Sequence, residues 1–135
     1  MLVIDSSAIV SMMLDEPGAD ALALRLAAEP RSGRMISAVN YVEAGTVLAG
    51  RRRDPYQGVS DLDAFLENFG IGVAPLDGET ARTAMQARIR FGKGFGAAVG
   101  LNFGDCFAYA LAKTLGAPLL FVGNDFGVTD IASAI

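Results

Sequence analysis

Short apolar runs alternate with longer amphipathic segments along the chain. An apolar run without polar interruptions predicts a strand that is buried on both faces, as in a parallel sheet. Such runs predict strands at residues 2–4, 35–36, 71–74 and 119–122. The segments between these runs are then the connections from one strand to the next.

These connecting segments carry apolar residues at helical spacing. They predict helices at residues 8–14, 19–29, 38–49, 60–68, 77–89 and 102–115. Ser6 and Ser7 are suitable caps for the first helix, and Ser37, Ser60 and Asn102 for later ones. The 102–115 helix is expected to bury one stripe, made of Phe103, Phe107, Leu111 and Leu115.

Two segments lack this spacing. Residues 91–101 are rich in glycine and predict a loop, and residues 128–135 predict a short helix or an edge segment. Strands that alternate with helices indicate an α/β fold in which helices cover both faces of a mostly parallel sheet. We therefore expect residues 1–135 to form a single three-layer α/β/α domain, a size that allows a proper core.

Composition narrows the possible chemistry. The chain has no histidine and a single cysteine, Cys106, which excludes Ser-His-Asp and Cys-His catalysis and makes a zinc site improbable. The remaining metal ligands are oxygens, which suit Mg²⁺ or Mn²⁺. The net charge of −4 argues against a general nucleic-acid binder but allows a nuclease that uses a metal ion.

Composition also bears on location. No apolar run approaches the roughly 20 residues of a membrane span, and no basic region precedes the first apolar run as in a signal peptide. The lone cysteine fits a reducing compartment. We predict a cytoplasmic protein with no membrane partner.

Four acidic residues stand beside apolar strands or helices: Asp5, Glu43, Asp105 and Asp125. Each of them alone is typical of a turn or a helix cap, and Glu43 alone would be compatible with a solvent-facing position. Asp5, Asp105 and Asp125 are placed at strand ends or helix starts, where open α/β sheets bind ligands. Converging carboxylates repel one another unless a cation lies between them, so the group favours a divalent metal site.

Four segments of the sequence resemble PIN domains, and VapC toxins of bacterial toxin–antitoxin pairs in particular. They are residues 2–8 (LVIDSSA), 37–43 (SAVNYVE), 102–113 (NFGDCFAYALAK) and 118–126 (PLLFVGNDF). The resemblance implies a PIN-like fold and a Mg²⁺- or Mn²⁺-dependent endoribonuclease. It also maps the acidic site of the family onto Asp5, Glu43, Asp105 and Asp125.

The resemblance gives these residues roles in the attack of a metal-activated water on an RNA phosphodiester. Asp5 and Asp105 are the main ligands, Glu43 ligates or orients water, and Asp125 completes the site. Asn124 stands where relatives can carry another acid, which weakens a second metal site.

Further polar residues are secondary candidates. Ser6 is placed to hydrogen-bond a ligand or the scissile phosphate, unless it only caps its helix. Asp130 either contributes to the site or, as we expect, caps a helix in the tail. For RNA, Arg51, Arg52 and Arg53 are equally consistent with phosphate contact and with a solvated helix end, and Arg88, Arg90 and Lys93 are placed to guide RNA.

The resemblance also implies a homodimer and a cognate VapB-type antitoxin. We accordingly expect Met12, Met13, Leu14 and the 38–49 or 60–69 helix to be partly exposed. Two alternatives remain open on the residues: a flavodoxin-like phospho-receiver and a PIN-like module that only binds RNA or protein. A receiver normally has paired acids early and a lysine after its last strand, whereas here only Asp5 ends the first strand and no lysine follows residue 113.

Overall fold

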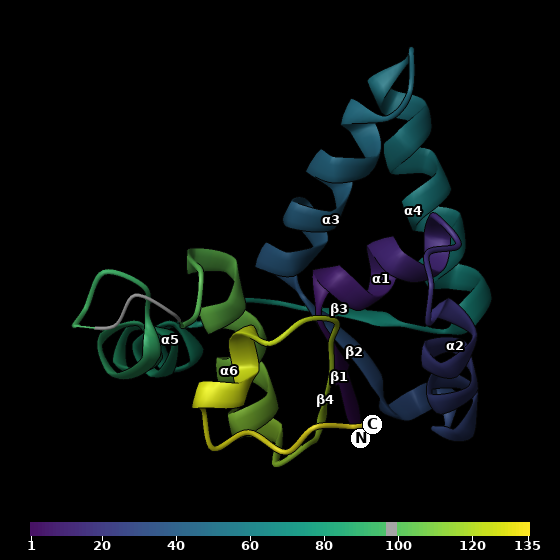
Figure 1. The fold of residues 1–135 in the computed structure, drawn as a ribbon. Helices are drawn as coiled ribbons and strands as arrows, with labels where there is room; N and C mark the ends of the chain where they lie inside the picture. The colour runs from purple at the N-terminus through teal and green to yellow at the C-terminus, as the bar shows by residue number, and fades with distance from the viewer. Residues whose placement is uncertain (97–99) are drawn as a thin grey trace.

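The computed structural model describes residues 1–96 and 100–135. Four strands form one sheet in the order β3-β2-β1-β4, and every neighbouring pair is parallel (Figure 1). The strands are β1 (Leu2–Ile4), β2 (Arg34–Ser37), β3 (Gly72–Ala74) and β4 (Leu119–Leu120). The helices are α1 (Ser6–Met13), α2 (Ala19–Ala28), α3 (Ala38–Gly50), α4 (Pro55–Phe69), α5 (Gly78–Phe91) and α6 (Phe103–Leu115), with 3₁₀ turns η1 (Arg31–Gly33) and η2 (Asp125–Val128).

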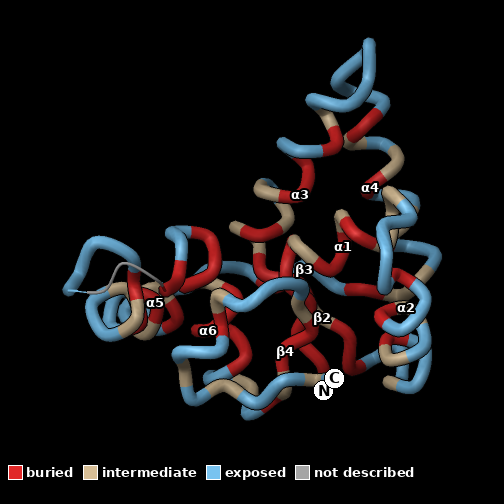
Figure 2. The backbone as a smooth tube through the Cα atoms, in the orientation of Figure 1, coloured by how far each residue is buried: buried red, intermediate tan, exposed pale blue. Residues whose placement is uncertain are grey.

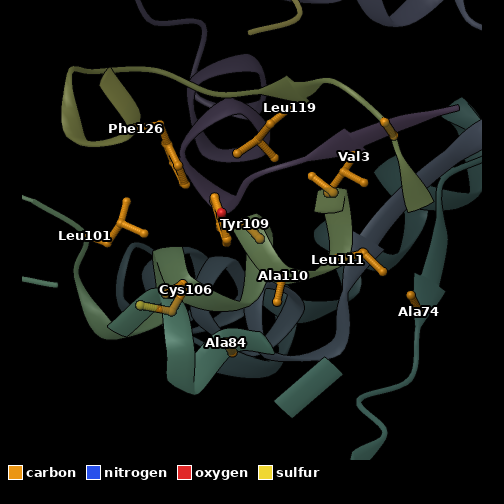
Figure 3. Close-up of a cluster of buried hydrophobic side chains, with 14 residues drawn as sticks. Val3, Ala74, Ala84, Leu101, Cys106, Tyr109, Ala110, Leu111, Leu119 and Phe126 are labelled. Carbon is orange, nitrogen blue, oxygen red and sulfur yellow. The ribbon is translucent and has the colours of Figure 1, made fainter. Parts of the chain in front are cut away.

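Two apolar cores cover the two faces of this sheet. Along β1, Leu2 and Ile4 pack into the core beneath α1 to α4, whereas Val3 packs on the opposite face against α5 and α6. Figure 3 shows the second core, in which Tyr109 of α6 lies among Val3, Leu119 and Phe126. The predicted three-layer α/β/α architecture is confirmed, because side chains along a strand alternate between faces.

Two predicted helix starts were wrong. Asp5, rather than Ser6 or Ser7, is the N-cap of α1, and its side chain accepts a hydrogen bond from Ser7 N. α4 begins at Pro55 with Asp54 as its cap, so Ser60 lies inside the helix. In both cases an aspartate beside a favourable first-turn residue starts the helix earlier, since Asp is as good a cap as Ser and Pro is well suited to the first helical position.

Two other predicted helix starts were correct, whereas the strand predicted at 119–122 ends at Leu120 and the helix predicted at 77–89 continues to Phe91. Ser37 caps α3 and Asn102 is the N-cap of α6. The prediction that Phe103 belongs to a buried stripe of α6 was wrong, because its side chain is 66% exposed. The helix is instead buried through most of its circumference, since it lies between the sheet and α5.

The glycine-rich segment and the tail are held at their ends. Phe91 completes α5, and Gly92 pairs with Leu101 at the base of the predicted 91–101 loop, of which residues 97–99 lie outside the described residues. Within the tail, Ser133 pairs with Leu119 of β4. The edge-segment prediction for the tail is therefore confirmed, and the short-helix alternative for residues 128–135 was wrong.

The α3–α4 hairpin projects away from the sheet, and its tip is exposed (Figures 1 and 2). Along α3, Val42 and Val47 are 62% and 40% exposed, and Met12, Met13 and Leu14 at the end of α1 are half-buried. The predicted partial exposure of this region is confirmed. Among the described residues, no helix combines the length and the apolar character that a membrane crossing requires.

Candidate active site

The four candidate acids line one cavity at the carboxyl edge of the sheet, although they come from four separate segments. The cavity has a volume of about 380 Å³. Its lining residues are Asp5, Ser6, Ser7, Val10, Glu16, Glu43, Val47, Asn102, Asp105, Val122, Asp125 and Phe126. Parallel strands all end at this edge, which explains how residues distant in sequence converge here.

Asp5 is the most deeply buried acid of the group, with only 2% of the residue exposed. Its Oδ2 accepts hydrogen bonds from Ser7 N at 3.0 Å and Ser7 Oγ at 2.5 Å, while its buried Oδ1 has no partner among the described residues. Burial raises the pKa of Asp5 to about 6; the bonds from Ser7 oppose this rise and the negative charge of Glu43 adds to it. An unpartnered, buried carboxylate oxygen is costly and therefore suited to bind a positive ligand.

Asp105 lies in the first turn of α6 and is 8% exposed. Its Oδ2 accepts a hydrogen bond from Asn102 N at 2.9 Å, as a capping box provides. Burial raises the pKa of Asp105 to about 7, against the lowering effect of that hydrogen bond, and the charges of Asp5, Asp125 and Glu43 raise it further. The same carboxylate thus caps its helix and faces the other acids.

Glu43 comes from α3 and is half-buried. Its Oε1 accepts hydrogen bonds from Ser6 Oγ at 2.5 Å and from Asn40 Nδ2 at 3.1 Å. No donor reaches Glu43 Oε2 from residues 1–96 or 100–135. One oxygen is thus fixed by the protein and the other remains available.

Asp125 begins η2, is half-buried and lines the same cavity. Its Oδ2 accepts a long hydrogen bond of 3.4 Å from Asn102 Nδ2. Asn102 therefore contacts two of the acids, through its backbone nitrogen and its amide.

The donor set suits a hard divalent cation, because it consists of carboxylate, hydroxyl and amide oxygens. The buried Oδ1 of Asp5 is unpartnered, and the pKa values of Asp5 and Asp105 are raised mainly by burial, with a further contribution from the charges of neighbouring acids. In the part of the chain that the structure describes, no three acidic, cysteine or histidine side chains lie close enough together to hold a metal ion as they stand. The indications of a cation site are therefore the oxygen donors that line the cavity and the unpartnered Oδ1 of Asp5.

Several predicted site residues lie elsewhere. Asn124 is exposed and does not line the cavity. Asp130 lies away from the acids, where its carboxylate accepts hydrogen bonds from Tyr109 Oη at 2.6 Å and Lys113 Nζ at 2.9 Å. The prediction that Asp130 caps a tail helix was wrong, since these contacts attach an extended tail to α6.

The basic residues also lie outside the cavity lining. Arg51, Arg52 and Arg53 are exposed at the tip of the α3–α4 hairpin, where Arg52 pairs with Asp61. Arg88 and Arg90 end α5, and Lys93 follows in the loop. Arg88 is half-buried, with Nη1 3.4 Å from the carbonyls of Lys93 and Leu101.

Sequence reasoning missed the contributions of two residues to the site, Ser7 and Glu16. Ser7 links the segment that follows β4 to Asp5, because its Oγ accepts from Val122 N at 3.0 Å and donates to Asp5. Glu16 adds a fifth acid to the lining. Ser7 resembled an ordinary helix cap in the sequence, and the turn that holds Glu16 gave no indication of a site.

The chain is similar in sequence to a known family and to proteins of that family. The sequence matches the PIN domain family over residues 2–132. It is 42% identical over 132 residues to Ribonuclease VapC of Mycolicibacterium smegmatis, which covers 98% of each chain. It is 41% identical over 133 residues to Ribonuclease VapC42 of Mycobacterium tuberculosis, again over 98% of each chain.

Solved structures share the fold. VapC20 of Mycobacterium tuberculosis, described as a sarcin–ricin loop cleaving toxin, superposes with a TM-score of 0.76 at 15% identity, over 98% of this chain and 97% of that chain. VapBC2 of Rickettsia felis, bound to a promoter DNA fragment, gives a TM-score of 0.71 at 13% identity, over 98% and 95% of the two chains. At such low identity these structures establish the common architecture alone.

Proposed function

This chain belongs to the PIN-domain family and to its VapC-type toxins, and from this premise we propose that it is a ribonuclease toxin that requires Mg²⁺ or Mn²⁺. The observation that carries the proposal is the convergence of Asp5, Glu43, Asp105 and Asp125 on one cavity. Full-length similarity to two proteins named ribonucleases supports the reaction class. Family membership favours this reading over a phospho-receiver, and the presence of all four acids favours it over an inactive binding module.

Asp5 and Asp105 would hold the metal, with Glu43 and Asp125 as further oxygen ligands, directly or through water. When bound, Mg²⁺ or Mn²⁺ lowers the pKa of a water molecule and offsets the negative charge that develops on the phosphate. The protein's part is to present ionised carboxylates in a fixed arrangement. Ser7 fixes Asp5, Asn102 fixes Asp105, and Ser6 with Asn40 fixes Glu43.

The free Oε2 of Glu43 is the group that we expect to orient the attacking water. The other oxygen of this carboxylate, Oε1, already accepts two hydrogen bonds, so the carboxylate cannot rotate without breaking them. No histidine base is present in the chain, and this arrangement needs none. Asn124 provides no charge at the cavity, which supports a single strongly held ion rather than two.

We propose that RNA reaches this acidic cavity along basic surface groups. Arg51 and Arg53 at the hairpin tip, Arg90 in the last turn of α5 and Lys93 just after it are exposed and available for phosphate contact. Arg88 has a structural role beside any contact with RNA, because it is directed toward backbone carbonyls.

We also propose a cognate antitoxin and a homodimer as partners, in a single PIN domain acting in the cytoplasm. The solved VapBC structure with a similar fold supports the antitoxin. Exposed apolar side chains on α3, together with half-buried Met12 and Met13, support further contacts on the α1–α3 side.

The test is cleavage of a mixed panel of structured RNAs by the purified chain, with Mg²⁺, with Mn²⁺ or with EDTA. We expect metal-dependent cleavage that Asp5→Asn reduces by at least 100-fold, because the substitution removes a charged ligand. Asp20→Asn on the exposed surface of α2 is the matched control and should cleave like the parent protein. Absence of both cleavage and Mn²⁺ binding in calorimetry would refute the proposal.

A further inference from the structure

Asn40 is a polar side chain with no exposed surface, in the first turn of α3. Its Oδ1 accepts a hydrogen bond from Ser37 Oγ. Its Nδ2 donates to Glu43 Oε1 at 3.1 Å and to the carbonyl of Gly104 at 3.0 Å. Both of these partners are pure acceptors, so the orientation of the amide is fixed.

The side-chain hydrogen bonds of Asn40 are not needed to form or cap either helix. The N-terminus of α3 is already capped by Ser37 Oγ, which accepts from Asn40 N at 3.0 Å. The Gly104 carbonyl is part of α6, and the helical conformation depends on backbone hydrogen bonds rather than on a side-chain donor. The amide of Asn40 therefore adds a link between α3 and the first turn of α6, and that turn carries Asp105.

Gly104 also contacts the Glu43 carboxylate, through the space that a Cβ atom would fill. A Cβ atom at position 104 would overlap Glu43 Oε2, and it would lie 2.8 Å from Oε1. Gly104 has no positive φ angle, so its backbone conformation does not demand glycine. The reason for glycine at this position is the space that the Glu43 carboxylate occupies.

We infer that Asn40 and Gly104 are positioning residues for Glu43, which together hold its carboxylate against the first turn of α6 at a fixed place relative to Asp105. Asn40 supplies the hydrogen bonds and Gly104 supplies the space. The inference rests on the proposed function, because it assigns the two residues to the metal-binding and water-orienting role of Glu43.

The first test uses Gly104→Ala, with Gly50→Ala as the matched control because a Cβ at position 50 meets open space. Alanine favours helix over glycine, so both variants should keep or raise the Tm. We expect Gly104→Ala to weaken Mn²⁺ binding in calorimetry by 10- to 100-fold, since the carboxylate must move. Gly50→Ala should bind Mn²⁺ like the parent protein.

The second test uses Asn40→Ala alone and combined with Glu43→Gln. We expect Asn40→Ala to weaken Mn²⁺ binding about 10-fold and to lower kcat for RNA with KM changed less than about twofold. In the Glu43→Gln background the same substitution should change Mn²⁺ affinity less than about twofold, because Asn40 acts through Glu43.

The outcomes separate the inference from the proposed function. A parent protein that binds no Mn²⁺ and cuts no RNA overturns both. A parent protein that binds Mn²⁺, together with a folded Gly104→Ala variant of unchanged affinity, overturns the inference alone. Equal losses from Asn40→Ala with and without Glu43→Gln would also overturn the role of Asn40, and Gly104→Ala decides the inference if Asn40→Ala does not fold.

Discussion

At the scale of single residues, the site places opposing demands on Asp5 and Asp105. Both carboxylates are buried near other acids, which favours their neutral forms, whereas metal binding requires their ionised forms. The protein therefore keeps, without metal, a destabilising charge that a cation would neutralise. Sites that bind ligands commonly retain such unfavourable groups.

This balance predicts a pH dependence of stability. Because the pKa values of Asp5 and Asp105 are raised to about 6 and 7 on folding, their contribution to stability is fully present below about pH 4 and is lost as pH rises to about 7. For Asp5 the change from 3.8 to about 6 corresponds to roughly 3 kcal/mol. Thermal unfolding in EDTA should show a lower Tm at pH 8 than at pH 5, and Mn²⁺ should restore the Tm at pH 8.

Asp5→Asn supplies the control for this prediction, because an amide keeps the shape of the carboxylate without its titration. Its Tm in EDTA should fall less between pH 5 and pH 8, and Mn²⁺ should raise it less. The pKa values of Asp61, Asp77 and Asp130 are lowered on folding, so ionisation of these groups makes stability rise with pH. That rise takes place below about pH 4, outside the range from pH 5 to pH 8. A metal-free Tm that rises from pH 5 to pH 8 would contradict the prediction.

At the scale of elements, the α3–α4 hairpin depends on one close approach of two helix backbones. Gly58 of α4 is buried, and a Cβ there would overlap the Leu48 carbonyl of α3 and lie 2.7 Å from Ala49 N. Backbone atoms cannot move aside as a flexible side chain can. The orientation of the hairpin, which carries both Glu43 and the exposed Arg51–Arg53 tip, therefore depends on this glycine.

Gly58→Ala should consequently destabilise the protein by about 1–3 kcal/mol, although alanine is the better helix former. Urea unfolding monitored by circular dichroism measures this change. Gly50→Ala, at the end of α3, meets no atoms and should be neutral or slightly stabilising. Equal stabilities for the two variants would show that the helices tolerate a larger separation.

At the scale of the whole molecule, charge is distributed unevenly. The net charge is −4 and five of the fifteen acids line the cavity, while exposed basic residues occupy the hairpin tip and the C-terminal end of α5 with the residues after it. Figure 1 shows these two regions on separate projections of the molecule. An RNA molecule that contacts both regions would have to span these two projections.

Two paired variants distinguish the basic regions: Arg51→Ala with Arg53→Ala, and Arg90→Ala with Lys93→Ala. A region that contacts phosphates should, when neutralised, weaken RNA binding and reduce the slope of log affinity against log salt by about 0.7 for each lost contact with single-stranded RNA. Fluorescence anisotropy over a salt series in Ca²⁺ or EDTA measures this slope. A pair that leaves both affinity and slope unchanged has no phosphate contact.

The sequence by itself determined the periodic elements and the chemistry of the ligands. Apolar runs and helical spacing are local properties, so they located the strands and helices and placed Asp5, Glu43, Asp105 and Asp125 beside them. The absence of histidine left oxygen ligands and a divalent cation as the consistent chemistry. The start of α4 at Asp54-Pro55 was mistaken because Asp and Ser are equally good caps, so the local sequence does not decide between Asp54 and Ser60.

Only the tertiary structure decided how these groups meet. The unpartnered Oδ1 of Asp5, the bridge from Asn40 to Gly104 and the removal of Asp130 from the site depend on contacts between segments far apart in the chain. Sequence periodicity describes which face of an element is apolar, but not which distant residue lies opposite it. Those contacts follow from packing the two helical layers onto one sheet, because the packing fixes distances that no local pattern encodes.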